Sequence, residues 1–422
     1  MTFDLSASPD FPEVIDLIER DATGRAIAQL GEYQLSSHFQ PIVSLSHQRV
    51  IGHEGLMRAS TANGRAVSPV DVLVAAQRNG ELVATDRVAR ALHVLNRPAS
   101  EAQWLFLNVH PEVFIEPLTS SSFTADLLAH QQMTNVDVVI EVLEDAIRDE
   151  VLFAERVGRL HEAGFLIALD DFGAGHSNFD RVWTVKPDIV KLDRSFALRS
   201  EQDAGARRLM PRIVNLLHEA GSLVLLEGIE TAVQAQIALD SDIDFVQGYY
   251  FARPAAVPEV GAALAANIRS LWHDFSAREA SAGMAQRELI APYQNALGYA
   301  SVLIVGGHVF PEACQGFLDL PLANFCYLLD SEGRQIGQNV WNTRGAPDAA
   351  QPSQRYRPLA SASEARWSRR PYFRRAIRQL DRVQVTRPYL SASTAELCVT
   401  LSVGFLHAGE PYVLCGDIAW PG

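Results

Sequence analysis

The chain has 422 residues, 48% hydrophobic and 20% charged, a composition typical of a globular protein with more than one domain. Its formal net charge of −14 at pH 7 argues against a general nucleic-acid-binding surface, which requires a basic patch. The cysteines lie in the last third of the chain without the short paired spacings of a zinc site, and we expect reduced core residues: Cys314, Cys326, Cys398 and Cys415.

The N-terminal segment MTFDLSASPDFPEVIDLIER has no basic stretch followed by an apolar run, so it does not resemble a secretory signal peptide. No uninterrupted apolar stretch in the sequence is long enough to span a bilayer. We therefore expect a cytoplasmic protein with no membrane span.

Short apolar runs alternate with longer segments of helical periodicity between Ser36 and Phe251, which is the pattern of repeated strand–helix units. Eight such runs favour a (β/α)8 barrel. The alternative is a doubly wound sheet, but no glycine-rich phosphate loop follows the first run, PIVSL. The runs begin at His38, Val50, Trp104, Val138, Phe165, Asp188, Leu223 and Phe245.

A long helical segment follows Pro254, and its alternating charged and apolar positions predict a helix that ends near Pro292. We interpret residues 257–295 as a connecting helix between a barrel at 1–256 and a second domain at 296–422. Alternatively, its first part, up to about Trp272, is the closing helix of the barrel.

The second domain is predicted to be a small α+β fold. FCYLLDSEGRQIGQNV contains a strand, a Ser-Glu-Gly turn and another strand. LCVTLSVGFLHAGEPYVLCGDIAW predicts two strands joined by a turn at His407 to Pro411. The arginine-rich segment between them, ARWSRRPYFRRAIRQL, is expected to be helical.

Acidic and amide side chains stand within or at the end of the predicted strands, where apolar residues are usual. In a parallel barrel the carboxyl ends of the strands converge on one face, so these groups would meet in one pocket and repel each other without a cation. Oxygen donors suit Mg²⁺ or Mn²⁺ better than zinc, and two ions about 4 Å apart would suit displacement at phosphorus. The residues are Glu54, Asn108, Glu141, Asp170, Asp171, Asp193 and Glu227.

Lysine is rare in this chain: 36 residues are Lys or Arg, but only Lys186 and Lys191 are lysines. Lys191 stands among the acidic strand ends, where a compact ammonium could stabilise a nucleophilic water or developing negative charge. A lone strand-end carboxylate is usually a rim residue or a helix cap, but a set spread over several strands indicates a site.

The segment HFQPIVSLSHQRVIGHEGLMR resembles the opening of an EAL domain, a cyclic di-GMP phosphodiesterase. The similarity continues in order through LNVHPEVF, IEVLED, LDDFGAGHSNFD, PDIVKLDRSF, LEGIET and VQGYYFARP, and it covers about Ser36 to Pro254. The resemblance implies metal-dependent hydrolysis of cyclic di-GMP to linear pGpG, with Mg²⁺ or Mn²⁺ as cofactor and two ions in the site. It also implies a homodimer.

The resemblance assigns a role to each matching residue. It implies metal ligation by Glu54, Asn108, Glu141, Asp170, Asp171 and Glu227, catalytic roles for Lys191, Asp193 and Glu227, dinucleotide binding by Leu56, Arg58 and Gln247, and stabilisation by Glu144 of the loop after the paired aspartates. Two residues depart from the family pattern without removing a metal ligand: Gly55 replaces an alanine, and Leu143 stands where threonine is common.

The segments RRPYFRRAI, RPYLSASTAELCVTLSVGF and VLCGDIAW of the second domain resemble PAS-like and Cache sensory modules. The resemblance implies regulation of the barrel by an unidentified small ligand. Aromatic walls with an arginine and an aspartate would suit a small zwitterion or acid, although the same residues could simply complete the core. The candidates are Trp367, Arg370, Tyr372, Tyr389 and Asp417.

Two functional hypotheses therefore remain open. The first is an enzyme that linearises cyclic di-GMP under the control of the second domain. The second is a catalytically weak or inactive receptor that binds the dinucleotide and signals to a partner. Retention of Lys191, Asp171 and Glu227 favours the enzyme, because a receptor does not need them. An adaptor without a ligand would not explain polar groups concentrated at strand ends.

Overall fold

The computed structural model describes residues 9–98, 104–115, 123–143, 149–175, 179–258, 262–343, 359, 362 and 364–420. The chain folds into two compact units, Met1–Ala277 and Arg278–Gly422. Helix α11 (Ala262–Val305) begins in the first unit and ends in the second. None of the helices in the described part of the chain is both long enough and apolar enough to cross a membrane.

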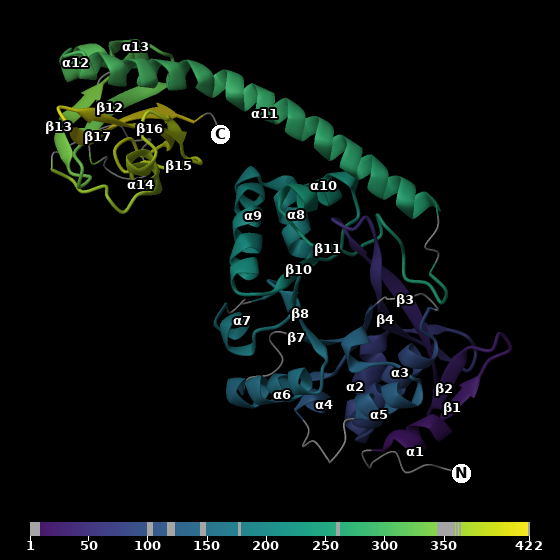
Figure 1. The fold of residues 1–422 in the computed structure, drawn as a ribbon. Helices are drawn as coiled ribbons and strands as arrows, with labels where there is room; N and C mark the ends of the chain where they lie inside the picture. The colour runs from purple at the N-terminus through teal and green to yellow at the C-terminus, as the bar shows by residue number, and fades with distance from the viewer. Residues whose placement is uncertain are drawn as a thin grey trace. The chain divides into compact units, whose positions relative to one another are not determined.

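The first unit is a closed barrel, as predicted, and Figure 1 shows its strands surrounded by helices. Within the described residues eight strands close the ring: β3 (Tyr33–Ser44), β4 (Arg49–Thr61), β6 (Trp104–Asn108), β7 (Val138–Leu143), β8 (Leu166–Phe172), β9 (Ile189–Leu192), β10 (Leu223–Leu226) and β11 (Phe245–Val246). Strands β4 to β11 of this ring pair in parallel.

The barrel differs from the expected (β/α)8 pattern at its first strand. Strand β3 runs antiparallel to both neighbours, β4 and β11. It is joined to β4 by a tight turn over 45–48 rather than by a helix, and Gln48 takes the left-handed φ of 55° that this turn requires. The first two apolar runs of the sequence therefore form a hairpin instead of a strand–helix–strand unit.

Helices follow most barrel strands, and several begin at a side-chain cap. Ser68, Asp149, Asp203 and Thr231 each accept a hydrogen bond from a backbone N–H in the first turn of the helix that follows. The described helices of the barrel are α2 (Pro69–Asn79), α3 (Leu82–Leu95), α4 (Pro111–Phe114), α5 (Phe123–His130), α6 (Glu150–Glu162), α7 (Phe179–Val185), α8 (Arg194–Gln202), α9 (Ala204–Glu219) and α10 (Ala232–Asp240), and the four caps named above precede α2, α6, α9 and α10. Before and beside the ring lie α1 (Phe11–Asp16), β1 (Ile18–Arg20), β2 (Ala26–Leu30) and β5 (Ala66–Val67).

The interior of the barrel is layered because side chains alternate along a strand. One layer is an apolar cluster formed by Ile42, Phe106, Val139, Ala168, Ile189, Leu225 and Phe245. Two residues further along strands β6 to β11, the same inward face carries polar groups: Asn108, Glu141, Asp170, Lys191, Glu227 and Gln247. Because side chains alternate with a period of two residues along a strand, the polar layer lies next to the apolar layer inside the barrel.

The second unit is an antiparallel sheet with strand order β13-β12-β17-β16-β14, and β15 pairs with β16. Both predicted hairpins are confirmed: β12 (Ala323–Leu329) pairs with β13 (Gln335–Trp341), and β16 (Leu397–His407) pairs with β17 (Glu410–Ala419). The remaining elements are β14 (Gln384–Val385), β15 (Tyr389–Leu390), α12 (Phe310–Ala313), α13 (Gln315–Leu318) and α14 (Pro371–Arg378). One face of the sheet packs with α11 to α13 and the other with α14.

Helix α11 does not end near Pro292 or at residue 295, as the sequence predicted, but continues to Val305. Pro292 is exposed, and its missing N–H removes one helical hydrogen bond that the rest of the helix tolerates. The apolar residues beyond it explain the continuation, because they have helical spacing and pack in the second core. Members of this stripe are Tyr293, Leu297, Ala300 and Ile304.

Candidate active site

The predicted site residues lie where the sequence placed them, within a barrel strand or directly after one. Glu54 lies within β4, Glu141 within β7, and Asn108 is the last residue of β6. Asp193 and Glu227 directly follow β9 and β10. All of these strands belong to the closed ring, so their side chains approach a common mouth.

A β-bulge explains how two adjacent aspartates serve the same mouth. In a regular strand Asp170 and Asp171 would point to opposite faces. The register between β8 and β9 shifts between Leu169 and Phe172, so both aspartates lie opposite the single residue Lys191. Asp171 takes a φ of 57°, and its N–H donates to Asp170 Oδ1 at 3.0 Å.

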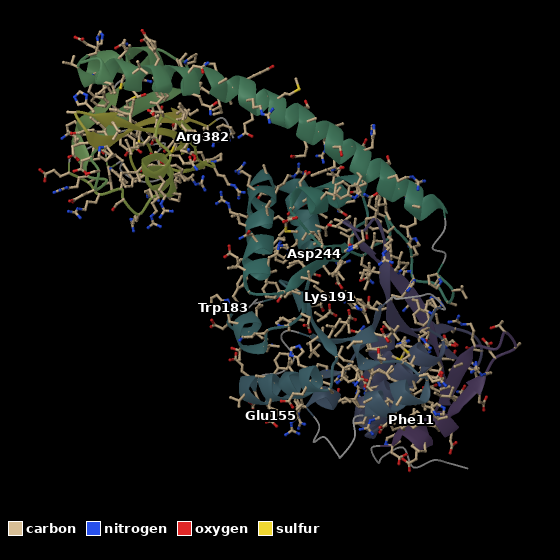
Figure 2. All side chains as sticks on the ribbon, in the orientation of Figure 1. Phe11, Glu155, Trp183, Lys191, Asp244 and Arg382 are labelled. Carbon is tan, nitrogen blue, oxygen red and sulfur yellow. The ribbon has the colours of Figure 1, made fainter. Side chains whose placement is uncertain are left out.

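Lys191 is the centre of the acidic cluster, and Figure 2 shows it inside the ring of strands. Its side chain is 1% exposed. The ammonium Nζ lies 2.7 Å from Glu141 Oε1, 2.9 Å from Asp170 Oδ1 and 2.7 Å from Glu227 Oε1. A longer ion pair of 3.9 Å joins it to Glu54 Oε1. The lysine thus partly neutralises the buried carboxylates.

Glu54 is held by side-chain amides from other parts of the barrel. Asn108 Nδ2 donates to Glu54 Oε1 at 2.9 Å, and Gln247 Nε2 donates to Glu54 Oε2 at 2.7 Å. Gln40, the cross-strand partner of Glu54, accepts from Gln247 Nε2 at 3.2 Å and donates to the Ala252 carbonyl at 3.1 Å. These bonds fix the direction of the Glu54 carboxylate.

Burial and neighbouring charges shift the pKa values of the acidic residues in different directions. Burial raises the pKa of Glu141 well above its usual value and raises that of Glu227 to about 8. Burial and the neighbouring Asp170 also raise the pKa of Asp171. For Glu54 the effect of burial is outweighed by the Lys191 charge and by hydrogen bonds, and the pKa is lowered. Burial lowers the pKa of Lys191, but the surrounding carboxylates raise it by more, so the lysine stays charged.

The donor set fits a hard divalent cation. Oxygen atoms of Asp170, Asp171 and Glu227 all lie within 4.8 Å of one another. Glu141 Oε2 is buried and accepts no hydrogen bond from any donor in the described ranges. Carboxylate and amide oxygens without cysteine or histidine suit Mg²⁺ or Mn²⁺, and one lysine leaves most of the acidic charge uncompensated.

The mouth holds a cavity of about 310 Å³. Its walls include the predicted residues Glu54, Asp170, Lys191, Glu227 and Gln247, and also Gln40, Arg194, Glu230 and Tyr249, which the sequence did not single out. Gln40 could have been found, because it interrupts an apolar strand as the acids do. For Arg194 and Glu230 we find no comparable signal.

Tyr249 is the most exposed ring of the aromatic run at 249–251. Its side chain is 50% exposed and lines the cavity, with the Arg253 guanidinium 4.2 Å from the ring centroid. Phe251 is buried in the barrel core, and Tyr250 packs against it. Of the three rings, Tyr249 is therefore the one available to stack on a ligand.

Other predicted residues lie outside this cavity. Leu56 and Arg58 continue the Glu54 face of β4 at alternate positions, and Arg58 Nη1 donates to the Met57 carbonyl at 2.9 Å. Asp193 caps helix α8 by accepting from the Ser195 N–H at 3.0 Å. Glu144 lies outside the described residues.

Gly55, which departs from the family pattern, has a local structural reason. A Cβ at this position would lie 2.7 Å from Cγ of His93. His93 is buried, its Nδ1 lies 2.8 Å from Ser37 Oγ, and burial lowers its pKa to about 3. The imidazole therefore occupies the space that an alanine methyl would need. Leu143, the second departure, is the exposed last residue of β7.

The predicted sensory residues also lie together, although in the second unit. They share the lining of one small cavity between the sheet, the start of α14 and the segment before β16: Trp367, Arg370, Tyr372, Tyr389 and Asp417.

The sequence model of the EAL domain matches residues 24–254, more than half of the chain. The chain belongs to the EAL domain family. The match includes Glu54 and all of the polar residues at the mouth of the barrel, up to Gln247. It ends at residue 254, before helix α11 begins.

Curated relatives match about half of the chain. A protein of Escherichia coli named probable cyclic di-GMP phosphodiesterase PdeG is 28% identical over 225 residues, which is 51% of this chain and 44% of that protein. The cyclic di-GMP phosphodiesterase RocR of Pseudomonas aeruginosa is 26% identical over 254 residues, 58% of this chain and 64% of RocR. The chain thus matches less than two thirds of the length of either relative.

A solved structure matches both units. The Bacillus subtilis YkuI protein, described as having an EAL domain and solved with substrate c-di-GMP and calcium, aligns with a TM-score of 0.76 and 23% identity. The alignment covers 92% of this chain and 97% of YkuI. At this identity the likeness shows a shared fold, which includes the second unit.

Proposed function

We propose that this protein hydrolyses cyclic di-GMP to linear pGpG in a reaction that depends on Mg²⁺ or Mn²⁺. The observation that supports this most directly is the layer of carboxylates around Lys191 at the mouth of an EAL-family barrel. A binding site for a dinucleotide would not need such an acidic layer, because a phosphodiester is itself anionic. Cations bound by these acids would reconcile the site with its substrate.

We assign the metal ligands to Glu54, Asn108, Glu141, Asp170, Asp171 and Glu227. Two bound ions would polarise the phosphodiester and activate water for attack at phosphorus. The bulge in β8 lets Asp170 and Asp171 face one mouth, and the amides of Asn108 and Gln247 orient Glu54.

The other side chains of the mouth bind and orient the substrate. Lys191 Nζ donates to the attacking water or to a phosphate oxygen that gains negative charge. Arg194 in the cavity wall provides a guanidinium group for the second phosphate, and Tyr249 stacks on a guanine. Arg58 lies outside the cavity on the same face of β4 as Glu54, and it provides a second guanidinium group for the same phosphate. Asp193, as the cap of α8, holds the start of the helix that carries Arg194.

We also propose that the second unit regulates hydrolysis and that the chain forms a homodimer. Helix α11 supports the first idea, because its residues belong to the cores of both units. An exposed apolar stripe near its end supports the second: Tyr299, Val302 and Val305 are 65%, 64% and 49% exposed. Light scattering on the purified chain would give the oligomeric state directly.

The decisive experiment incubates purified protein with cyclic di-GMP and Mg²⁺ or Mn²⁺ and follows linear pGpG by chromatography. We expect product with either metal, none in a chelated control, and none from a Glu54→Ala variant. Metal-independent product would contradict the proposed site. Tight dinucleotide binding without product under any metal would replace the enzyme with a receptor.

A further inference from the structure

Another cavity lies at the end of the barrel opposite the mouth. Its volume is about 370 Å³, compared with about 310 Å³ for the cavity of the mouth. Strands β6, β10 and β11 line it with their first residues, whereas the residues at their other ends belong to the acidic layer. From Trp104 to Asn108, the two ends of β6, the strand rises by about 13 Å. The two cavities are therefore separate sites, with the apolar layer of the barrel between them.

The floor of this cavity is apolar and aromatic. Ile51 and Trp104 pack against the apolar layer of the barrel, to which Phe245 belongs. The rings of Trp104 and Phe245 meet edge to face, with their centroids 5.9 Å apart and their planes at 86°. Leu223 at the rim is 39% exposed. An aromatic ring placed on this floor would remove its apolar surface from water.

The turn between β3 and β4 supplies a polar wall. Arg49, the first residue of β4, is exposed and lines the cavity, and its guanidinium makes no hydrogen bond or ion pair with any described residue. The turn holds its shape without Arg49, because Ser44 Oγ lies 2.9 Å from His47 Nδ1 and accepts from the His47 N–H at 3.3 Å. The guanidinium is therefore available to a carboxylate, which it can bind through two parallel hydrogen bonds.

Asp244 is the one acid among the described residues of the lining, and its carboxylate is already engaged. Its Oδ2 lies 2.8 Å from His218 Nε2 and accepts from the Val224 N–H at 2.8 Å. The same arrangement occurs one strand–helix unit earlier, where Asp188 lies 3.0 Å from His161. These bonds thus belong to the framework of the barrel, and the charge that the lining offers to a ligand is the Arg49 cation.

We propose that this cavity binds a small aromatic carboxylate. The ring lies over Trp104 and Phe245, and the carboxylate pairs with Arg49. The volume is large enough for one or two fused rings with a short acidic side chain. A carboxylate carries one negative charge and matches the single guanidinium, whereas a phosphate dianion would bring excess negative charge close to Asp244. This binding does not depend on the proposed hydrolysis.

Isothermal titration of the full-length protein without cyclic di-GMP tests the class of ligand. The probes are benzoate and indole-3-acetate. Their amides lack the charge, acetate lacks the ring, and phenyl phosphate replaces the carboxylate by a phosphate. We expect the aromatic acids to bind at least tenfold more tightly than the amides or acetate. Absence of aromatic-acid binding at millimolar concentration, equal binding of the amides, or tighter binding of phenyl phosphate would overturn the proposal.

Two variants and a matched control identify the site. Arg49→Gln should weaken binding of the aromatic acids at least tenfold. Leu223→Trp should fill the cavity from its rim and weaken binding of the acids and their amides alike. Both residues are exposed, so we expect both variants to fold. Arg78→Gln, in an exposed arginine of α2, should leave binding unchanged. Undiminished binding by the Arg49→Gln protein would place the ligand elsewhere and overturn the proposal.

Discussion

At the scale of single residues, Lys191 acts as an internal counter-ion. Its ammonium lies within 3 Å of three buried or partly buried carboxylates. Removing one partner of a buried ion pair is costly because the remaining charges lose their compensation. Lys191, for which we propose a catalytic role, is therefore also expected to stabilise the fold when no metal is bound, and these two roles are separable by experiment.

We expect Lys191→Met to abolish hydrolysis and to lower the free energy of unfolding in chelator by about 3–5 kcal/mol. Added Mg²⁺ should restore much of this loss, because cations replace the missing ammonium. Urea unfolding with and without metal measures both effects. The chain's other lysine, Lys186, is exposed, so Lys186→Met is the control. Equal stability of Lys191→Met and wild type in chelator would refute the counter-ion role.

Gly55 offers a second test at this scale. Gly55→Ala should cost about 1–3 kcal/mol, because the new methyl group overlaps the His93 ring. In a double-mutant cycle with His93→Ala, the two changes should compensate, since truncation of the imidazole makes room for the methyl. Gly158→Ala, in an open position of α6, should instead stabilise by about 0.5–1 kcal/mol. A Gly55→Ala protein as stable as wild type would contradict this account.

The sequence revealed the acidic layer because a carboxylate within an apolar strand is conspicuous. It did not reveal the bulge at Asp170 and Asp171, because strand register depends on the partner strand. The sequence also could not explain why residue 55 is a glycine, since His93 becomes its neighbour only through the packing of α3 against the barrel.

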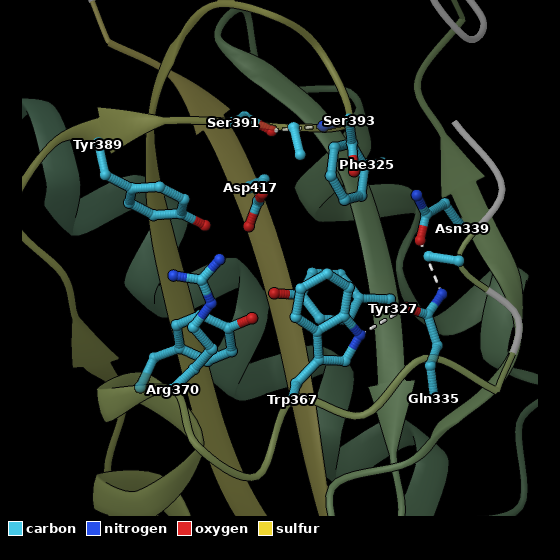
Figure 3. A pocket seen from close by; sticks show the side chains of 13 residues that line it. Phe325, Tyr327, Gln335, Asn339, Trp367, Arg370, Tyr389, Ser391, Ser393 and Asp417 are labelled. Carbon is cyan, nitrogen blue, oxygen red and sulfur yellow. Dashed lines mark hydrogen bonds between the residues drawn. The ribbon is translucent and has the colours of Figure 1, made fainter. Parts of the chain in front are cut away.

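At the scale of elements, the Asp417 position makes the stability of the second sheet depend on pH. Its pKa of about 7 lies above the ordinary value of 3.8, so the folded state holds the proton more tightly. The contribution of this carboxyl is complete below about pH 4 and is lost as the pH rises through about 7. Arg370, Cys398 and the tyrosines of the cavity face Asp417 (Figure 3). These groups are the same in the wild type and in any variant at position 417.

We expect Asp417→Asn to remove this dependence. The Thr400 hydroxyl donates to Asp417 at 2.7 Å. Asparagine offers the same hydroxyl an oxygen and has no proton to lose. The stability of the variant relative to wild type should therefore increase by about 4 kcal/mol between acidic and mildly alkaline pH. Calorimetric unfolding of both proteins across this range measures the difference. A constant difference at all pH values would show that Asp417 titrates normally.

Most elements were predictable from apolar periodicity, including both hairpins of the second sheet. Two features were not. The first two barrel strands look like any other pair of apolar runs, and only their pairing shows that β3 is antiparallel. Pro292 is a usual helix boundary, but packing of the residues after it outweighs the lost hydrogen bond.

At the scale of the whole molecule, α11 joins two cores. Leu264, Ile268 and Leu271 pack in the barrel core, and Trp272 Nε1 donates to the Leu45 carbonyl at 2.8 Å. The first part of the helix therefore packs as the closing helix of the barrel, in agreement with the alternative interpretation of this segment. Length and composition indicated two domains, but not how this helix is divided between them, because its apolar positions continue without a break.

Two truncated proteins test this division. A fragment of residues 1–277 should fold and, if the proposed function holds, hydrolyse cyclic di-GMP, because it contains the whole acidic layer. A fragment of residues 1–256 lacks the α11 contacts and should unfold at a clearly lower urea concentration. Equal urea midpoints for the two fragments would show that α11 does not stabilise the barrel.

The bulge in β8 has an evolutionary consequence. Asp170 and Asp171 share one place in the pairing with β9, so deleting either residue would restore regular strand pairing while removing a carboxylate. Loss of catalysis and gain of backbone regularity would then come from the same single deletion. In a lineage that no longer needs turnover, one such deletion would therefore give a stable barrel that binds the dinucleotide without hydrolysing it.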